Sequence, residues 1–282
     1  MSLRIVTDST ADLPSALAAQ HRVTVVPLTL MFGDEQLLDG VDITSEKFFR
    51  RLVREPRLPT TSQPAPGAFR AAYEALIAEG ATEILSIHLS SKLSRTLESA
   101  RLGAQGLSAR IEHVDSGLTS LALGLGVVAA AARATGGATL DETRAHVADQ
   151  FRRTHLYFMV DTLEFLRRGG RIGRAQELIG SLLQFKPLLA IEDGAVVPIG
   201  RARTKQRAIE ELLRLAGELR PIEQMMAVHA TTPEDLDFLV DRLHGLAPDA
   251  PVTVGRITPV IGVHAGPGLL GFAVVTASPS AH

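Results

Sequence analysis

The sequence contains no cysteine, few aromatic residues and almost no net charge, and each feature excludes a class of protein. Without cysteine there are no disulfide bonds, no thiol catalysis and no thiolate metal sites. Aromatic residues make up 4% of the 282 residues and the formal net charge is −2. The chain therefore has no basic field that would indicate a nucleic acid or an anionic membrane as the partner. It also lacks the interleaved aromatic residues that are typical of nucleic-acid binding.

Long hydrophobic runs are also missing from the chain. The longest mostly apolar stretch, Leu118 to Ala132, contains Thr119 and Ser120 and is closed by Arg133. It is too short to span a membrane and is typical of a buried helix. The first residues, MSLRIVTDST, enter a strand-like run without the apolar segment of a signal peptide. These features predict a cytoplasmic protein without stable membrane insertion.

Hydrophobic residues make up 45% of the chain, which is enough for one large or two modest domains. In the first half, short β-branched runs alternate with helical patterns. Strands are expected at Arg4–Thr7, Val23–Val26, Glu83–Ile87 and Ile111–Val114, and helices at Phe69–Ala78, Leu93–Ala104 and Ser120–Arg133. This alternation predicts a doubly wound parallel sheet, whose ligands gather beyond the carboxyl ends of the strands. The Pro-rich segment 56–69 is expected to be an ordered loop that leads into a helix.

The second half has a different pattern. Two strand-like runs flank the turn Asp193-Gly194, which is typical of a hairpin, and Lys205–Leu219 is expected to be an amphipathic helix. Further strands are expected at Leu156–Val160, Met226–His229, Val252–Arg256 and Leu270–Val275. We therefore expect an α/β protein with a parallel α/β domain over residues 1–160 and an α+β domain with a mixed sheet over residues 161–282.

Hydroxyl-rich turns are the first candidates for a binding site. Four segments stand out, namely Asp8-Ser9-Thr10, Thr60 to Pro64, Ser90 to Thr96, and Asp115-Ser116. Ser, Thr and Asp commonly cap helices, so each turn alone has an ordinary structural explanation. Together, hydroxyls and helix-start amides can also hold an anion without a full positive charge.

Two further segments could supply cationic or polar contacts. Residues 167–174 place four arginines among three glycines, which indicates either a solvated basic turn or an arginine directed at a carboxylate. His264 lies in Val263 to Gly268, which we interpret as a loop too rich in glycine for a helix. A single histidine is usually structural, but this one precedes a strand and is a candidate for a polar contact.

Motifs that would indicate catalysis or nucleotide binding are not found. The sequence has no G-x-S-x-G nucleophile elbow, no H-E-x-x-H zinc motif and no Walker-type phosphate loop. One G-x-G-x-x-G does occur, Gly266 to Gly271, but it leads into a strand near the C-terminus instead of opening a helix. We interpret it as a turn. A Ser-His-Asp triad assembled by the fold stays possible, although no spacing favours one.

Taken together and in this order, six segments resemble the DegV family. They are Val6 to Pro14, Thr61 to Gly67, Ser90 to Ser94, Asp115-Ser116, Leu163 to Arg174 and Val263 to Gly268. The resemblance runs from Ile5 to about Val275. It implies two intertwined α/β domains that enclose one long-chain fatty acid. It also implies a non-enzymatic role as the acyl-carrying, lipid-binding subunit of bacterial fatty acid kinase. A separate kinase subunit would bring ATP and Mg²⁺ and convert the bound carboxylate to an acyl phosphate.

By motif position, the resemblance implies that Thr61, Ser62 and Ser94 bind the carboxylate and that Arg171 and His264 lie close to it. No metal site, catalytic residue or resident cofactor is expected. The chain departs from the family at Arg95, where relatives usually carry glycine. Because Arg95 follows Ser94 at the start of a predicted helix, it is expected to turn away from the ligand and face solvent.

Two other functions are compatible with the sequence. A lipid hydrolase or acyltransferase would use Ser94 or Ser62 as the nucleophile and His264 as the base. A ligand-sensing module would bind the same lipid without meeting a kinase.

Overall fold

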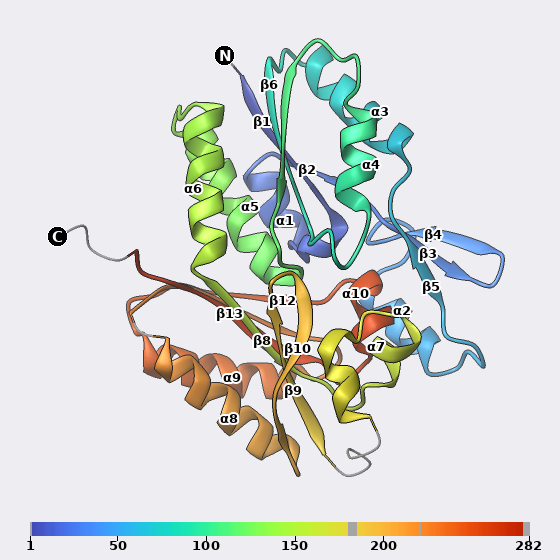
Figure 1. Cartoon of the computed structure of the whole chain (residues 1–282), viewed down its shortest axis with the longest axis vertical. Coiled ribbons are helices and arrows are strands. Elements are labelled where there is room, and N and C mark those ends of the chain that lie inside the picture. The colour runs from blue at the N-terminus through green and yellow to red at the C-terminus, as the bar shows by residue number, and fades with distance from the viewer. Residues whose placement is uncertain (1, 180–184, 220, 279–282) are drawn as a thin grey trace.

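The computed structural model describes residues 2–179, 185–219 and 221–278, and the alternating pattern of the first half forms the expected parallel sheet. In the order β2-β1-β6-β7, its strands are β1 (Leu3–Asp8), β2 (Val23–Val26), β6 (Glu83–His88) and β7 (Arg110–Asp115). All neighbouring strands run parallel. Their carboxyl ends point toward the second half of the molecule, and the polar turns that follow them lie there (Figure 1).

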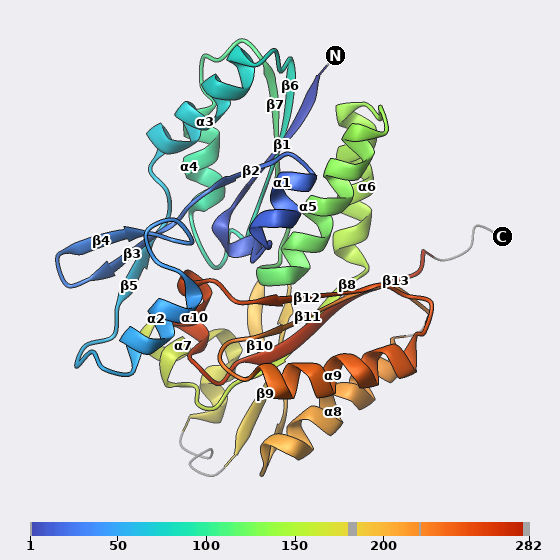
Figure 2. The ribbon, with the colours of Figure 1, turned by 180° about the vertical axis from the view of Figure 1, so that it is seen from behind.

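Helices cover both faces of this sheet (Figures 1 and 2). The helices of this half are α1 (Ser15–Gln20), α3 (Pro66–Ala78), α4 (Thr96–Gly103), α5 (Ser120–Thr135) and α6 (Leu140–Arg152), with the short 3₁₀ helix η1 (Ser9–Ala11) after β1. Helices α3 and α4 pack on one face, and α5 and α6 on the other. Helix α4 begins at Thr96, three residues later than expected, because Leu93 and Ser94 form a turn whose amides bond to the Ser90 carbonyl.

A small antiparallel sheet, which the sequence did not predict, projects from the side of the first half. It consists of β3 (Thr29–Phe32), β4 (Glu35–Leu38) and β5 (Thr60–Ser62), in the order β4-β3-β5. Along the chain, helix α2 (Ser45–Leu52) lies between β4 and β5. The segment 56–69 is therefore not entirely a loop. Thr61 pairs with Leu30 of β3, and this pairing holds the hydroxyls of β5 at a fixed position.

The second half forms the expected mixed sheet. In the order β10-β9-β8-β13-β11-β12, its strands are β8 (Thr154–Met159), β9 (Lys186–Glu192), β10 (Ala195–Ala202), β11 (Ile222–His229), β12 (Val252–Arg256) and β13 (Leu270–Thr276). Only β11 and β12 run parallel. The hairpin of β9 and β10 turns at Asp193 and Gly194, both at positive φ, as a type I′ turn requires.

Helices α8 (Lys205–Glu218) and α9 (Pro233–Leu246) cover one face of the mixed sheet, and α5 of the first half packs on the other (Figure 2). The remaining short helices are α7 (Glu164–Arg168), the 3₁₀ helix η2 (Gly173–Leu178) and α10 (Pro259–Ala265). Helix α10 corrects the expectation that His264 lies in a loop. The helix has Pro259 in its first turn, and Gly262 fits against Phe48, where a Cβ would lie 2.6 Å from the ring.

The two halves are intertwined. Helix α10, from near the end of the chain, packs on α2, β3 and β5 of the first half, while β8 already belongs to the mixed sheet. One hydrophobic core runs through both, from Ile5 to Val275. The division into domains at residues 160 and 161 stays a prediction.

Two buried carboxyl groups hold the start of α10 against the first half. Asp12 Oδ1 accepts a hydrogen bond from the Thr258 amide (2.8 Å), and Asp39 Oδ1 accepts one from the Val260 amide (3.2 Å). Ser120 Oγ also donates to Asp12 Oδ2. Burial raises the pKa of Asp12 to about 7 and that of Asp39 to about 6, despite these hydrogen bonds.

Replacing Asp12 should therefore change the pH dependence of stability. Between pH 3.8 and about 7 the folded chain holds a proton on Asp12 that the unfolded chain has released, so the contribution of this group to wild-type stability declines as pH rises. Asp12→Asn keeps an acceptor for the Thr258 amide but does not titrate. Its unfolding free energy minus that of wild type should rise across this window, by at most about 1.4 kcal/mol per pH unit. Urea unfolding at several pH values measures this difference, and a pH-independent difference would contradict the assignment.

Candidate functional site

A cavity lies where the carboxyl ends of the parallel strands meet the mixed sheet and α10. It encloses about 860 Å³ of space outside the protein atoms, its mouth included. Most of its wall is apolar, and the mixed sheet supplies Leu156 and Phe158 of β8, Ile191 of β9, Val196 of β10 and Val228 of β11. A pocket with this lining suits an apolar ligand with one polar end.

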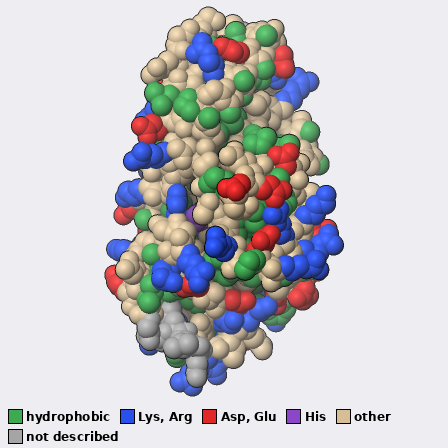
Figure 3. All heavy atoms as spheres, turned by 90° about the vertical axis from the view of Figure 1, so that its right-hand side faces the viewer, with side chains coloured by type: hydrophobic (Ala, Val, Ile, Leu, Met, Phe, Trp, Pro, Cys, Tyr) green, Lys and Arg blue, Asp and Glu red, His purple; other side chains and the backbone are tan. Residues whose placement is uncertain are grey.

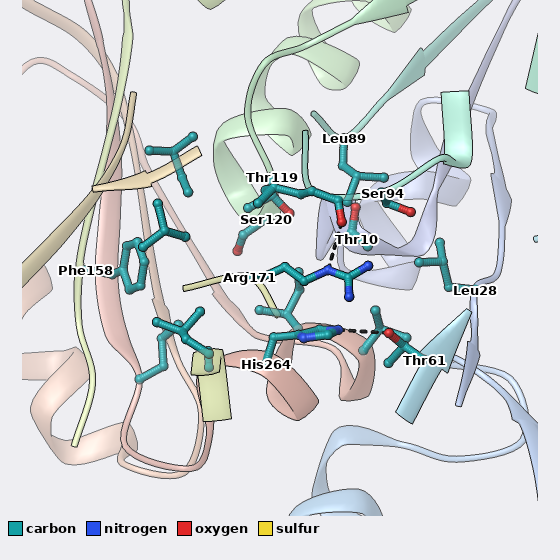
Figure 4. Close-up of a pocket in the computed structure, with 18 of the residues that line it drawn as sticks. Thr10, Leu28, Thr61, Leu89, Ser94, Thr119, Ser120, Phe158, Arg171 and His264 are labelled. Atoms are coloured by element: carbon teal, nitrogen blue, oxygen red, sulfur yellow. Dashed lines mark hydrogen bonds between the residues drawn. The ribbon is translucent and has the colours of Figure 1, made fainter. Parts of the chain in front are cut away.

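The polar side chains of the cavity include all five residues expected from the sequence. Thr61 and Ser62 reach it from β5, Ser94 from the loop before α4, Arg171 from the loop after α7, and His264 from α10 (Figure 4). Four segments far apart in the sequence thus meet at one place. Their functional roles stay predictions.

His264 is held as a neutral imidazole. Its Nε2 lies 2.8 Å from Thr61 Oγ1, and its Nδ1 is buried without a hydrogen-bond partner among the described residues. Burial, and to a smaller extent the nearby Arg171 charge, lowers the pKa of His264 to about 4. Gly169 makes room for the ring, since a Cβ there would lie 2.2 Å from Nδ1.

Arg171 turns into the cavity and is positioned by backbone carbonyls. Its Nε donates to the Leu93 carbonyl (2.9 Å) and its Nη1 to the Gly169 carbonyl (2.7 Å). Within residues 2–179, 185–219 and 221–278, no carboxylate forms an ion pair with it. A partly buried guanidinium without a counter-ion is a strong attractor for an anionic ligand.

The other arginines of the same segment do not share this role. Arg167 and Arg168 both pair with Glu164, at 2.8 and 2.5 Å, and Arg174 lies 3.4 Å from Glu192. All three side chains are at least half exposed. Most of the Arg-Gly segment is therefore a solvated basic turn, while Arg171 points inward. That Arg171 is directed at a carboxylate stays a prediction.

Ser94 and Ser62 differ in the hydrogen bonds that their hydroxyls make within the protein. Ser94 Oγ lies 2.9 Å from Thr96 Oγ1, so one of these hydroxyls donates to the other. Ser62 makes only a long contact of 3.4 Å to the Gln63 carbonyl. Arg95 is exposed and does not line the cavity, which confirms the expectation that it faces solvent.

Four polar residues of the cavity were not singled out individually by the sequence: Thr10, Gln63, Thr119 and Ser120. Thr10 and Gln63 lie within the hydroxyl-rich turns, so that signal was present. Thr119 and Ser120 were treated as interruptions of an apolar run, and only the position of α5 beside the cavity shows their place. Asp115 and Ser116, which were candidates, line a different hollow.

The site lacks the arrangement that a serine hydrolase needs. Ser94 and Ser62 have the partners given above instead of His264, whose Nδ1 has no carboxylate to orient it in the described structure. A triad-like chain does exist elsewhere, since Asp8 Oδ2 lies 2.9 Å from His88 Nδ1 and His88 Nε2 lies 2.7 Å from Ser86 Oγ. Both His88 and Ser86 are fully buried and neither lines the cavity, so no substrate reaches them.

Neither a metal cluster nor a membrane span is found in the described part of the chain. No three His, Asp or Glu side chains there are arranged to hold a metal ion. None of the helices in residues 2–179, 185–219 and 221–278 is long and apolar enough to cross a membrane.

Comparison with known proteins gives one consistent family. The sequence profile described as "Uncharacterised protein, DegV family" matches residues 2–277. A DegV domain-containing protein of Streptomyces coelicolor is 40% identical over 274 residues, which cover 96% of this chain and 97% of the relative.

Solved structures of relatives share the whole fold. A Thermus thermophilus structure described as fatty acid binding of a DegV family protein has a TM-score of 0.91 at 36% identity, with 98% of this chain and 100% of that chain covered. The Bacillus subtilis structure of DegV, described as a fatty acid binding protein, has a TM-score of 0.89 at 31% identity, with 98% and 99% covered.

The electrostatics of the site can be measured directly. In ligand-free protein the His264 imidazole should titrate near pH 4, well below its ordinary pKa of 6.5. Arg171→Gln should raise this pKa, because a like charge is removed, but should leave it below 6.5, because burial is the larger cause. NMR titration of the histidine ring signals, assigned by their loss in His264→Gln, gives both values. A wild-type pKa of 6.5 or above would refute the description of the site.

Proposed function

The chain belongs to the DegV family, and from that premise we propose that it binds one long-chain fatty acid in the cavity and presents its carboxylate to a separate ATP-dependent fatty acid kinase subunit. The observation that carries the proposal is an apolar cavity with an arginine at its polar end that no described carboxylate neutralises. The relatives described as fatty acid binding proteins support the ligand class.

Arg171, Thr61 and Ser94 are the residues that we assign to the carboxylate. A neutral His264 with its proton on Nε2 donates to Thr61 Oγ1, and the Thr61 hydroxyl is then free to donate to the ligand. Ser94 can do the same when it accepts from Thr96. Ser62 lies beside Thr61 and adds another donor. The guanidinium of Arg171 supplies the charge, and the hydroxyls fix the orientation.

The tail would contribute most of the affinity. Burying about 14 methylene groups at roughly 0.8 kcal/mol each gives on the order of 11 kcal/mol before ordering costs. The hydrogen bonds at the head are each worth about 0.5–3 kcal/mol, the upper part of this range applying to charged partners. Retention therefore depends on the tail, while the head determines how the carboxylate is presented.

Access to the carboxylate from outside is provided by a second hollow, here called the outer pocket. Thr61, Arg171 and His264 line both the cavity and the outer pocket, and Arg57 and Arg168 also line the outer pocket. Figure 3 shows this side of the molecule, where a histidine lies in a hollow among Lys and Arg side chains. We assign the outer pocket to the approach of the phosphoryl group from the partner, because cations there would balance the charge that develops on transfer.

The first test is the ligand itself. Purified protein should carry close to one fatty acid of about 14 to 18 carbons per chain, because apolar burial of this size survives purification. Mass spectrometry of the organic extract identifies it. After delipidation, palmitate or oleate should raise the melting temperature. An extract without fatty acid, together with no thermal shift, would exclude the proposal.

The second test separates binding from presentation. His264→Gln and Arg171→Gln should each lower acyl phosphate formation with a fatty acid kinase ATP-binding subunit by more than about tenfold, while palmitate affinity falls much less. The reason is that a donor or cation near the reacting oxygen contributes most when charge develops. Production of ADP with bound palmitate as the acceptor measures turnover, and the thermal shift measures binding.

Arg174→Gln is the matched control for these variants. Arg174 belongs to the same segment, but it is exposed, lies near Glu192 and does not line the cavity. It should leave turnover and binding unchanged. Equal turnover in wild type, His264→Gln and Arg171→Gln would remove both residues from the head-group site without affecting the assignment of the tail.

A further inference from the structure

A third hollow, the side groove, lies behind one apolar wall of the cavity and shares no lining residue with the outer pocket. This side groove is formed by the loops after β6 and β7, the end of α6, the start of β8 and the turn between β9 and β10. It shares Ile191 with the cavity and none of the head-group residues. The side groove therefore adjoins the part of the cavity that would hold the tail.

The wall between the two hollows is a single layer of chain. Along the loop after β6, Leu89 lines the cavity and the next residue, Ser90, lines the side groove. In the same way Leu118 lines the groove and Thr119 lines the cavity. Ile191 itself lines both hollows, so its side chain is the thinnest part of the wall.

A hydrogen-bonded latch keeps this wall closed. Ser90 Oγ donates to the Gly194 carbonyl (2.7 Å), which fastens the turn of the β9–β10 hairpin to the loop after β6 across 104 positions of sequence. The Ser90 amide donates to the Leu118 carbonyl (2.8 Å), so the same residue also ties in the loop after β7. Contact at the latch is close, since a Cβ on Gly194 would lie 2.4 Å from Ser90 Oγ. Ser90 is only 1% exposed.

Beyond the latch, part of the groove can accept carbon atoms. Val114, Leu118, Phe151 and Ile191 give it an apolar floor, and each is almost buried in the folded chain. Polar and charged side chains line the rest of the groove, among them Lys92, Asp115, Arg152 and Asp193. The terminal methylenes of a chain too long for the cavity would lie on this floor instead of being compressed inside.

We propose that Ile191 and the Ser90–Gly194 latch set the longest acyl chain that the protein accepts, and that opening this wall lets the methyl end of a longer fatty acid pass into the side groove. The inference rests on the proposed function, because it assigns the tail to the cavity. It adds residues that determine specificity and that lie far from the carboxylate.

The experiment compares acyl-length profiles. Delipidated protein is equilibrated with an equal mixture of saturated fatty acids of about 14 to 24 carbons, and the bound acids are quantified by mass spectrometry relative to palmitate. Wild type should discriminate against acids beyond its optimum by about tenfold for each two added carbons, as expected for an overpacked closed cavity. Ile191→Ala should bind the longest acids within about threefold of palmitate, since the extra carbons leave the cavity.

Two further variants make the result specific. Ser90→Ala removes the latch without enlarging the cavity and should extend the profile in the same direction. Val196→Ala is the matched control, because Val196 lines the cavity from the same hairpin but does not line the side groove. This variant should lengthen the best-bound acid by at most about two carbons, because the volume that it frees is small. Binding of longer acids should then decline as steeply as in wild type.

The outcomes separate this inference from the proposed function. If wild type binds no fatty acid of any length, the proposed function fails. If wild type binds palmitate but the Ile191→Ala profile parallels that of Val196→Ala, the wall does not limit chain length and the inference is wrong. It is equally wrong if wild type accepts the longest acids as well as palmitate. Palmitate binding and the melting temperature of each variant report whether it is folded.

Discussion

The seating of α10 on two buried carboxyl groups is the constraint on which the rest of the site depends. The first amides of a helix have no partner within the helix and must find acceptors elsewhere. Here Asp12 and Asp39, both from the first half, accept the amides of Thr258 and Val260. The other end of this seven-residue helix carries His264 to within 2.8 Å of Thr61. The same helix therefore joins the halves and places the imidazole.

Much of the fold follows from local sequence patterns. Strands at Val23–Val26 and Val252–Arg256 have the predicted bounds, and the hairpin at Asp193-Gly194 turns where its glycine indicated. The small sheet was missed because Thr29–Phe32 and Glu35–Leu38 lack the run of β-branched residues that marked Val23–Val26, and Thr60–Ser62 is only three residues long. Helix α10 was missed because Gly266 and Gly268 made the segment around His264 look too rich in glycine for a helix, whereas both glycines follow the end of the helix at Ala265. The one glycine inside it, Gly262, is required by contact with Phe48, a residue 214 positions earlier.

Some features of the site could likewise be predicted from short sequence segments, and others depend on residues that only the fold brings together. Hydroxyl-rich turns and the Arg-Gly segment pointed to an anion, and the resemblance selected Arg171 among four arginines. The structure supplies a physical reason for that choice, because Arg167, Arg168 and Arg174 have acidic neighbours and Arg171 has only carbonyls. The apolar cavity could not be drawn from the sequence, because its lining residues come from many elements and are individually ordinary core positions.

Arg171 and His264 together explain why a carboxylate suits this site better than a neutral polar group. A partly buried guanidinium held by carbonyls retains its full charge, and that charge is one reason why the pKa of His264 is low. A neutral ligand would leave the charge of Arg171 uncompensated and gain only ordinary hydrogen bonds from Thr61 and Ser94. A carboxylate instead compensates the arginine, and it favours the protonated imidazole, which raises the pKa of His264. Under the proposed function, head-group selectivity would therefore come from charge in a weakly screened setting, while the neutral walls beyond it would select only by length and shape.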